Sequence, residues 1–165
     1  TSIKQKFNAA GQIIESDVWY GRPRHLFIYT DKGLLAEKKS YEGYDQYTKV
    51  KYEYNTAGQL VKDESYSKEG NLESRKTYQY QKKNNQLVIN NLAEYFKNDN
   101  IEKIIWTETY DAKGLLIKLT TAESETLYSY QLDSNGNWIT KSGETKNLKT
   151  GMTTTELGSR KIEYY

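Results

Sequence analysis

Apolar and polar residues alternate along much of this chain. Val50, Tyr52 and Tyr54 occupy every second position of one segment, with charged residues between them, and Tyr128 and Tyr130 repeat the pattern. A period of two places successive side chains on opposite faces, which is typical of half-buried antiparallel strands. The chain is therefore predicted to consist mainly of short strands.

Thirteen segments fit this pattern and are bounded by turn-forming residues. They are residues 3–7, 12–20, 25–29, 34–41, 47–54, 59–66, 71–80, 86–96, 101–110, 115–122, 126–132, 137–144 and 153–165. Residues 90–96 also fit a helical turn, so both interpretations stand for that part of the eighth segment. Residues 145–152 are predicted to form a loop before the last strand.

A short motif connects many of these strands and occurs six times. An aromatic residue, once replaced by Leu, precedes a small polar residue, two variable residues, Gly, any residue and a large apolar residue. The small polar side chain can bond the backbone two residues on, and Gly adopts a positive φ without steric cost. Each copy therefore predicts a turn that ends in a glycine bulge. The structural turn glycines are Gly11, Gly33, Gly58, Gly70, Gly114 and Gly136.

The spacing of these glycines leaves room for one degenerate copy between Gly70 and Gly114. Residues 80–87 fill it, with Asn in place of Gly, because Asn tolerates a positive φ better than most residues. Twelve or thirteen short strands joined by tight turns predict a sequential antiparallel meander, since parallel pairing needs long crossovers. We expect one all-β domain over residues 1–165, strongly curved or rolled into an open barrel or half-shell, because large twisted sheets curl.

Composition narrows the possible functions. The 24 Lys and Arg residues balance 22 Asp and Glu residues to a net charge of +2, which does not favour nucleic acid as a partner. The chain has no long apolar run that would predict a membrane span. It also has no Cys, which excludes disulfides, zinc–thiolate sites and cysteine nucleophiles. Its 16 Tyr against 3 Phe indicate a shallow core, because Tyr covers a surface that is only partly dry.

The sequence contains no arrangement of residues that indicates a catalytic site. His25 is the only histidine, and a general base would need a nucleophile and an orienting partner that the sequence does not indicate. Carboxylate pairs such as Asp63 and Glu64 are interpreted as solvated faces, and the turn aspartates lack the spacing of a calcium loop. We predict no catalytic residue, no metal and no cofactor, and a protein that is not an enzyme.

Aromatic residues near the irregular connections are the candidate ligand-binding site. Tyr and Trp on a rigid sheet offer large contact areas with little loss of entropy, and they stack on sugars or on peptide aromatics. The alternative is that they pack the sheet. The candidate residues are Trp19, Tyr20, Tyr41, Tyr44 and Tyr47.

The repeated motif resembles a known family. Residues 110–116, Tyr-Asp-Ala-Lys-Gly-Leu-Leu, with relatives that begin at Tyr29, Tyr54 and Tyr66, are similar to the tyrosine-aspartate (YD, or RHS) repeat of bacterial secreted and cell-surface proteins. The chain departs from that pattern because Tyr-Asp in the turn register occurs only once and no copy has Arg after the Gly. The resemblance implies an all-β scaffold of hairpins with no chemistry of its own, in a secreted, periplasmic or cell-surface protein.

Three hypotheses of function follow. The first is an exported, non-enzymatic β-repeat module that acts as a scaffold or adhesive surface, with an unknown protein or glycan partner at the cell surface. The second is a carbohydrate-binding domain that uses the aromatic residues. The third and least favoured is an enzyme acting through paired carboxylates. Because Thr1 is not an initiator residue, we expect either a removed signal peptide or a boundary inside a longer repeat array.

Overall fold

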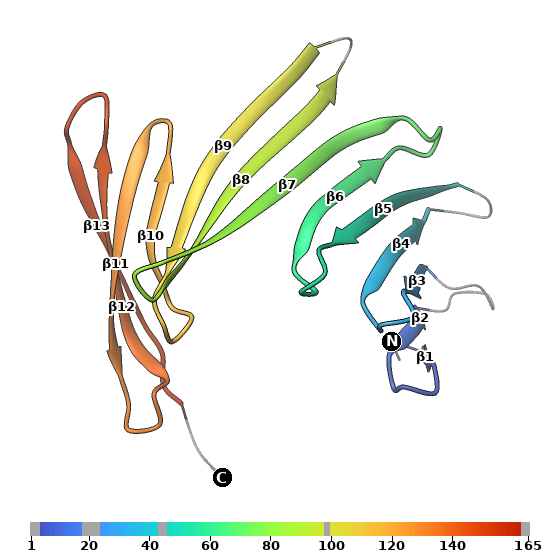
Figure 1. Cartoon of the computed structure of the whole chain (residues 1–165), viewed down its shortest axis with the longest axis horizontal. Coiled ribbons are helices and arrows are strands. Elements are labelled where there is room, and N and C mark those ends of the chain that lie inside the picture. The colour runs from blue at the N-terminus through green and yellow to red at the C-terminus, as the bar shows by residue number, and fades with distance from the viewer. Residues whose placement is uncertain (1–3, 18–23, 43–45, 98–99, 163–165) are drawn as a thin grey trace. The chain divides into compact units, whose positions relative to one another are not determined.

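All regular elements in the described part of the protein are β-strands. A computed structural model describes residues 4–17, 24–42, 46–97 and 100–162. The strands are β1 (Gln5–Phe7), β2 (Ile13–Ser16), β3 (His25–Tyr29), β4 (Leu35–Tyr41), β5 (Tyr47–Tyr54), β6 (Leu60–Tyr66), β7 (Leu72–Lys83), β8 (Gln86–Lys97), β9 (Asn100–Tyr110), β10 (Leu116–Thr121), β11 (Ser124–Leu132), β12 (Trp138–Asn147) and β13 (Thr153–Ser159) (Figure 1). These residues include no helix that could cross a membrane.

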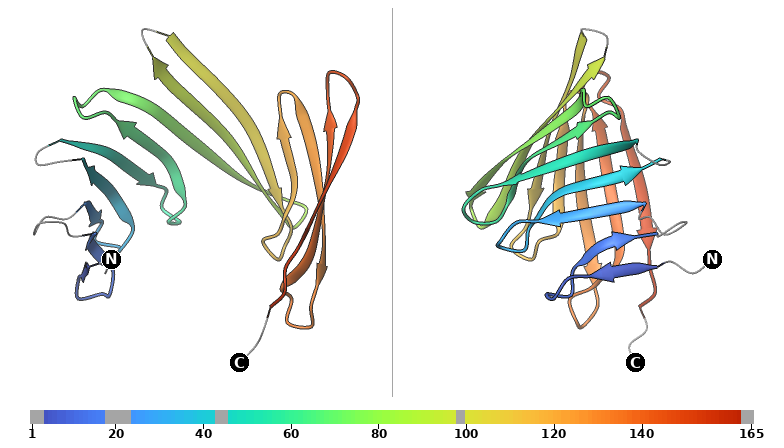
Figure 2. Two further views of the ribbon diagram at one scale, coloured as in Figure 1. Left: turned by 180° about the vertical axis from the view of Figure 1, so that it is seen from behind. Right: turned by 90° about the vertical axis from the view of Figure 1, so that its right-hand side faces the viewer.

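The strands follow one another in the sheet in the order of the sequence. The sheet order runs from β1 to β13 without a crossover, and every pairing whose register is described is antiparallel. The path from each strand to the next can be followed in Figure 2. The predicted all-β meander of hairpins is therefore confirmed. Within this order β1 and β13 are the two edge strands, so the sheet does not close into a barrel.

The repeated motif forms one kind of turn. All six of its glycines have a φ between 75° and 85°. At the turn after β5, the Asn55 side-chain Oδ1 accepts hydrogen bonds from the backbone N–H groups of Ala57 (3.0 Å) and Gln59 (2.9 Å), and the Gly58 N–H donates to the Asn55 carbonyl at 3.0 Å. The same backbone bond closes the other five copies. The polar residue and the glycine thus reverse the chain over four residues without help from distant parts of the protein.

Among the described connections, those between β7 and β8, between β10 and β11, and between β12 and β13 differ from this turn. Between β7 and β8 the chain reverses over Asn84 and Asn85, whose φ angles are 50° and 62°. Positive φ at both central residues is the mark of a tight two-residue hairpin, so the predicted degenerate copy is a different turn type with longer flanking strands. A further turn with Gly151 at a φ of 73° lies in the predicted loop before β13.

The helical interpretation of residues 90–96 is wrong. These residues lie inside β8, which runs without a break from Gln86 to Lys97. Apolar and polar residues alternate only weakly from Asn90 to Phe96. However, β8 lies between β7 and β9, whose backbones form hydrogen bonds with it. Tertiary pairing therefore overrides the local ambiguity.

The strands fall into two compact units. Unit 1 contains Thr1–Tyr78 and Ala93–Ile104, and unit 2 contains Gln79–Leu92 and Ile105–Tyr165. Each unit is built of the same hairpins, and the strands β7, β8 and β9 contribute residues to both.

The hydrophobic core is shallow. Among the described residues, Ala93 is the only hydrophobic residue that is buried. Tyrosine hydroxyl groups take part in holding neighbouring hairpins together: Tyr54 donates to the carbonyl of Leu35 at 2.9 Å, and Tyr130 donates to that of Leu116 at 2.7 Å. The abundance of Tyr fits this arrangement, because the ring covers apolar surface while the hydroxyl group bonds the backbone.

Candidate functional site

Two of the five candidate ligand-binding residues meet on one face of unit 1. Tyr41 at the end of β4 lies opposite Tyr47 at the start of β5, and their ring centroids are 5.2 Å apart with planes tilted by 50°. Both rings are half-buried. Trp19, Tyr20 and Tyr44 lie outside the described residues.

Lysines extend this pair into a larger surface, which we call the lysine–tyrosine face. It consists of Lys39, Tyr41, Tyr47, Lys49, Lys51 and Tyr66, from β4, β5 and β6. The Lys39 Nζ lies 4.8 Å from the centre of the Tyr47 ring. The Nζ atoms of Lys49 and Lys51 lie 4.8 and 5.6 Å from the centre of the Tyr66 ring.

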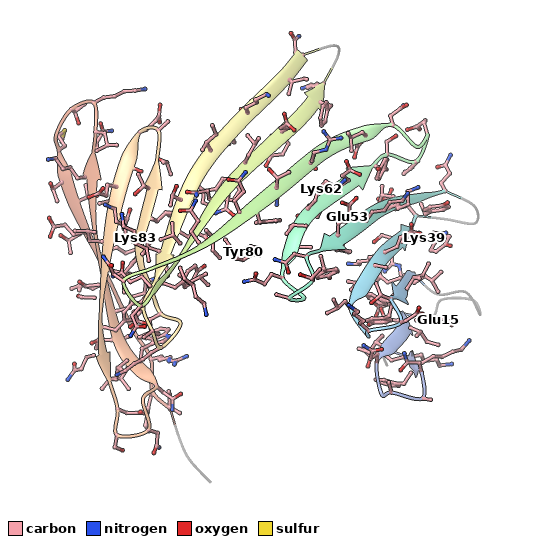
Figure 3. The ribbon with its side chains drawn as sticks, viewed as in Figure 1. Glu15, Lys39, Glu53, Lys62, Tyr80 and Lys83 are labelled. Atoms are coloured by element: carbon pink, nitrogen blue, oxygen red, sulfur yellow. The ribbon has the colours of Figure 1, made fainter. Side chains whose placement is uncertain are left out.

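Register explains why these groups gather. Lys39 is directly opposite Lys49 across β4 and β5, and Lys49 is directly opposite Tyr66 across β5 and β6. Like charges directly opposite each other destabilise a sheet, whereas an ammonium group over an aromatic ring is attracted to it. The face therefore presents cations held above aromatic rings, an arrangement that can stack on a flat ligand and attract acceptor groups. Figure 3 labels Lys39 on β4.

A ladder of alternating charges continues across the neighbouring strands of unit 1. The Glu64 carboxylate accepts hydrogen bonds from the Tyr66 hydroxyl and from the Arg75 Nε, each at 2.8 Å. An Arg75 guanidinium nitrogen lies 3.7 Å from a Glu94 carboxylate oxygen, and the Lys103 Nζ lies 3.0 Å from the other oxygen of that carboxylate. Glu64 is buried, so its charge is stabilised by these partners rather than by water.

Glu64 was predicted to lie on a solvated face, but it is buried and belongs to this ladder, which spacing along the chain does not reveal. The sequence contains the alternating charges, but they become neighbours only when the pairing of β6 with β7 places Glu64 opposite Arg75. Glu53 and Lys62, labelled in Figure 3, form an ion pair of the same kind between β5 and β6. The ladder is a structural feature that begins beside the lysine–tyrosine face, at the hydrogen bond between Tyr66 and Glu64.

His25 has polar neighbours that the sequence did not indicate. Its Nδ1 lies 3.1 Å from the Ser40 Oγ, and its Nε2 lies 3.8 Å from an Asp17 carboxylate oxygen. Burial, followed by the positive charge of Lys38, lowers the pKa of His25, and Asp17 opposes this shift. The neutral imidazole that results could in principle accept a proton from the serine hydroxyl group.

The geometry around His25 does not complete a hydrolytic site. The distance to Asp17 exceeds that of a hydrogen bond, so the carboxylate does not fix the imidazole. Ser40 lies within β4, which pairs with β3 on one side and β5 on the other. The strand ladder therefore uses the backbone N–H groups that would have to stabilise an oxyanion. Within the described residues, no group of three His, Asp or Glu side chains could hold a metal ion.

The chain shares its fold with two solved bacterial structures. It superposes on part of the Tc holotoxin pore of Photorhabdus luminescens with a TM-score of 0.54 and 17% identity, covering 93% of this chain and 8% of that chain. It superposes on a porin-like protein from Bacteroides uniformis with a TM-score of 0.54 and 13% identity, covering 93% of this chain and 86% of that chain. The chain thus spans only a small part of the toxin chain. Neither a protein-family model nor a curated protein matches the sequence.

The charge ladder predicts a stability loss in acid. The hydrogen bond from Tyr66 is the largest cause that lowers the pKa of Glu64 below its ordinary value of 4.5, with Arg75 and Lys62 adding to it and burial opposing it. Because the folded pKa is lower than the unfolded pKa, the stabilisation is complete above about 4.5 and disappears as the pH falls through the folded value. Urea unfolding at stepwise lower pH should therefore show a shallower acid loss in Glu64→Gln than in the unchanged chain.

The control is Glu73→Gln, which neutralises an exposed glutamate on β7. It should keep the acid profile of the unchanged chain. Equal profiles for Glu64→Gln and Glu73→Gln would contradict a stabilising role of the ladder.

Proposed function

We propose that the chain is a non-enzymatic β-repeat module of the YD-repeat family, exported by a bacterium, that acts as a scaffold or adhesive surface for a protein partner at the cell surface. Six copies of the motif, each forming a hairpin turn, support the family. The shared fold with two bacterial structures is consistent with it. The exported location rests on the resemblance of the repeat.

The edge strand β13 is the observation that carries this proposal. All seven of its residues are exposed, and the Leu157 side chain is 80% exposed. The strand contains one charged residue, Glu156, and no proline. Its register with β12 runs from Lys146 to Thr140 without a bulge. Such an edge leaves one row of backbone groups regularly spaced and open to a further strand.

The opposite edge is built differently. The described part of β1 has three residues, includes a lysine and has a register shift between Lys6 and Phe7. Short length, lysine and bulges are the devices by which proteins prevent edge-to-edge pairing. Because β1 has these devices and β13 does not, β13 is the edge that would accept a partner strand. Backbone hydrogen bonds would supply affinity, and the side chains of alternate residues would supply selectivity.

A lysine in β13 tests this proposal. We expect the unchanged chain to self-associate at high concentration through β13, and Leu157→Lys to remain monomeric, because a charge in the middle of an edge strand opposes pairing. Sedimentation velocity over a range of concentrations measures the difference. Met152→Lys is the matched control, since it adds the same charge at an exposed apolar residue outside the strand. Equal sedimentation of all three proteins would count against an adhesive edge.

Carbohydrate binding is the second candidate function. The stacked pair of Tyr41 and Tyr47, with Lys39 above the Tyr47 ring, is the observation that favours it. Half-buried tyrosine rings on a sheet keep a fixed orientation, so they lose little entropy when a sugar ring stacks on them. A lysine beside them can donate hydrogen bonds to hydroxyl or carboxylate oxygens.

Thermal unfolding against a panel of soluble glycans tests the second candidate. A glycan at one hundred times its dissociation constant should stabilise the chain by about 2.7 kcal/mol. Tyr41→Ala and Tyr47→Ala should abolish this shift while leaving the melting temperature without glycan nearly unchanged. Tyr52→Ala, on the opposite face of β5, should keep the shift. A large loss of stability in Tyr41→Ala and Tyr47→Ala would mean that these residues only pack the sheet.

A further inference from the structure

A hollow of about 630 Å³ lies between two neighbouring turns of unit 2. One turn joins β7 to β8, and the other joins β9 to β10. Leu87 and Ile89 of β8 and Tyr110 of β9 provide its apolar lining. A volume of this size is in the range of sites that bind small molecules, roughly 300 to 1,000 Å³.

The rim of the hollow carries polar side chains that the fold does not use. They belong to the tip of the β7–β8 hairpin, and within the described parts of the chain none of them has a hydrogen-bond or ion-pair partner. They are Lys82, Lys83, Asn84, Asn85 and Gln86. Lys83 is labelled in Figure 3, at the end of β7.

The other turns whose residues are described use polar side chains for their own closure. The facing turn shows the contrast, because the Asp111 Oδ1 accepts hydrogen bonds from the backbone N–H groups of Lys113 and Leu115, both at 2.9 Å. Positive φ explains why asparagine occupies the tip of the β7–β8 hairpin. It does not explain why lysines line an apolar hollow at this turn.

The wall formed by Tyr110 is uncharged. Its hydroxyl donates to a Glu108 carboxylate oxygen at 3.0 Å, which fixes the ring against the hollow. Burial first, and then this hydrogen bond, raise the pKa of Tyr110 to about 12, so the phenol stays neutral. Asp111 is the acidic residue of the lining, and its Oδ1 accepts hydrogen bonds from two backbone N–H groups. Its single negative charge is outnumbered by the two positive charges of the lining lysines. The lysines therefore set the preference of the hollow for anions.

We infer that this hollow binds a small organic carboxylate with an apolar or aromatic body. The carboxylate lies against the ammonium group of Lys82, which is opposite Leu87 across the two-residue turn and shares its face of the sheet, and the body lies on Leu87, Ile89 and Tyr110. Charge-assisted hydrogen bonds orient the ligand, and apolar contact supplies the rest of the affinity. The site is independent of the edge strand β13 and of the lysine–tyrosine face, so it goes beyond the proposed function.

Titration of the ¹⁵N-labelled chain with 4-phenylbutyrate, followed by NMR, tests the inference. The expected result is that the amide signals of residues 82–87 and 111–114 shift together and saturate. The uncharged 4-phenylbutanamide should bind at least about tenfold more weakly, because it cannot form charge-assisted bonds with the lysines. Butyrate, which lacks the aromatic body, should also bind more weakly. Shifts spread over the whole chain, no shifts, or equal binding of acid and amide would overturn the inference.

Matched variants separate the lysines from general effects of charge. Lys82→Gln combined with Lys83→Gln should reduce the affinity for 4-phenylbutyrate to that for the amide. Lys97→Gln removes a charge at the far end of β8 and should leave the affinity unchanged. Unaltered amide spectra outside the hairpin show that each variant is folded. Retention of full affinity in the double variant would overturn the inference.

Two sources could supply the same ligand chemistry. A free metabolite and the C-terminus of a protein both offer a carboxylate next to an apolar group. A short peptide ending in Phe, with a free or an amidated C-terminus, distinguishes them in the same titration. Tighter binding of the free-acid peptide than of 4-phenylbutyrate identifies a protein C-terminus, and the reverse order identifies a small metabolite.

Discussion

The left-handed glycine at the end of the turn that occurs six times is the constraint on which the rest of this protein depends. Only glycine adopts that backbone conformation without strain, and the polar residue at the start of the turn satisfies the backbone groups that the reversal exposes. Together they return the chain antiparallel to itself within four residues. Such a turn follows six of the thirteen strands, and the remaining connections are also too short for crossovers, so the meander follows from the short connections.

A meander built this way needs little core. Cross-strand pairs, ion ladders and tyrosine hydroxyl groups that bond carbonyls of the neighbouring hairpin replace the large buried side chains of a globular domain. The described part of the chain accordingly buries one hydrophobic residue, Ala93. Because the described sheet faces bury so few hydrophobic side chains, most of their side chains remain half-buried or exposed. The lysine–tyrosine face and the hollow beside Tyr110 are two surfaces that arise in this way.

Local features of the chain were predictable from the sequence, and features that depend on register were not. The turns at Gly58 and Gly114 could be predicted because the residues that form them lie within four consecutive positions. The opposition of Lys39 to Lys49 and the contact of His25 with Ser40 depend on which residues of two strands face each other. A shift of one residue would move each of them to the other face, so spacing along the chain cannot reveal them. The same limit explains the wrong helical interpretation around Asn90, since the strand partners of β8 decide its conformation.

Comparing a turn variant with a strand variant tests the central claim most directly. Gly114 has a φ of 80°, and a Cβ there would meet nothing within 4 Å, so Gly114→Ala introduces backbone strain alone. This strain should reduce the free energy of unfolding by about 1–2 kcal/mol in urea titrations. Leu119→Ala, in the half-buried strand β10, should reduce it by no more than that. A loss of about 3–5 kcal/mol for Leu119→Ala, the range seen for well-packed cores, with little loss for Gly114→Ala, would contradict a fold that depends on its turns.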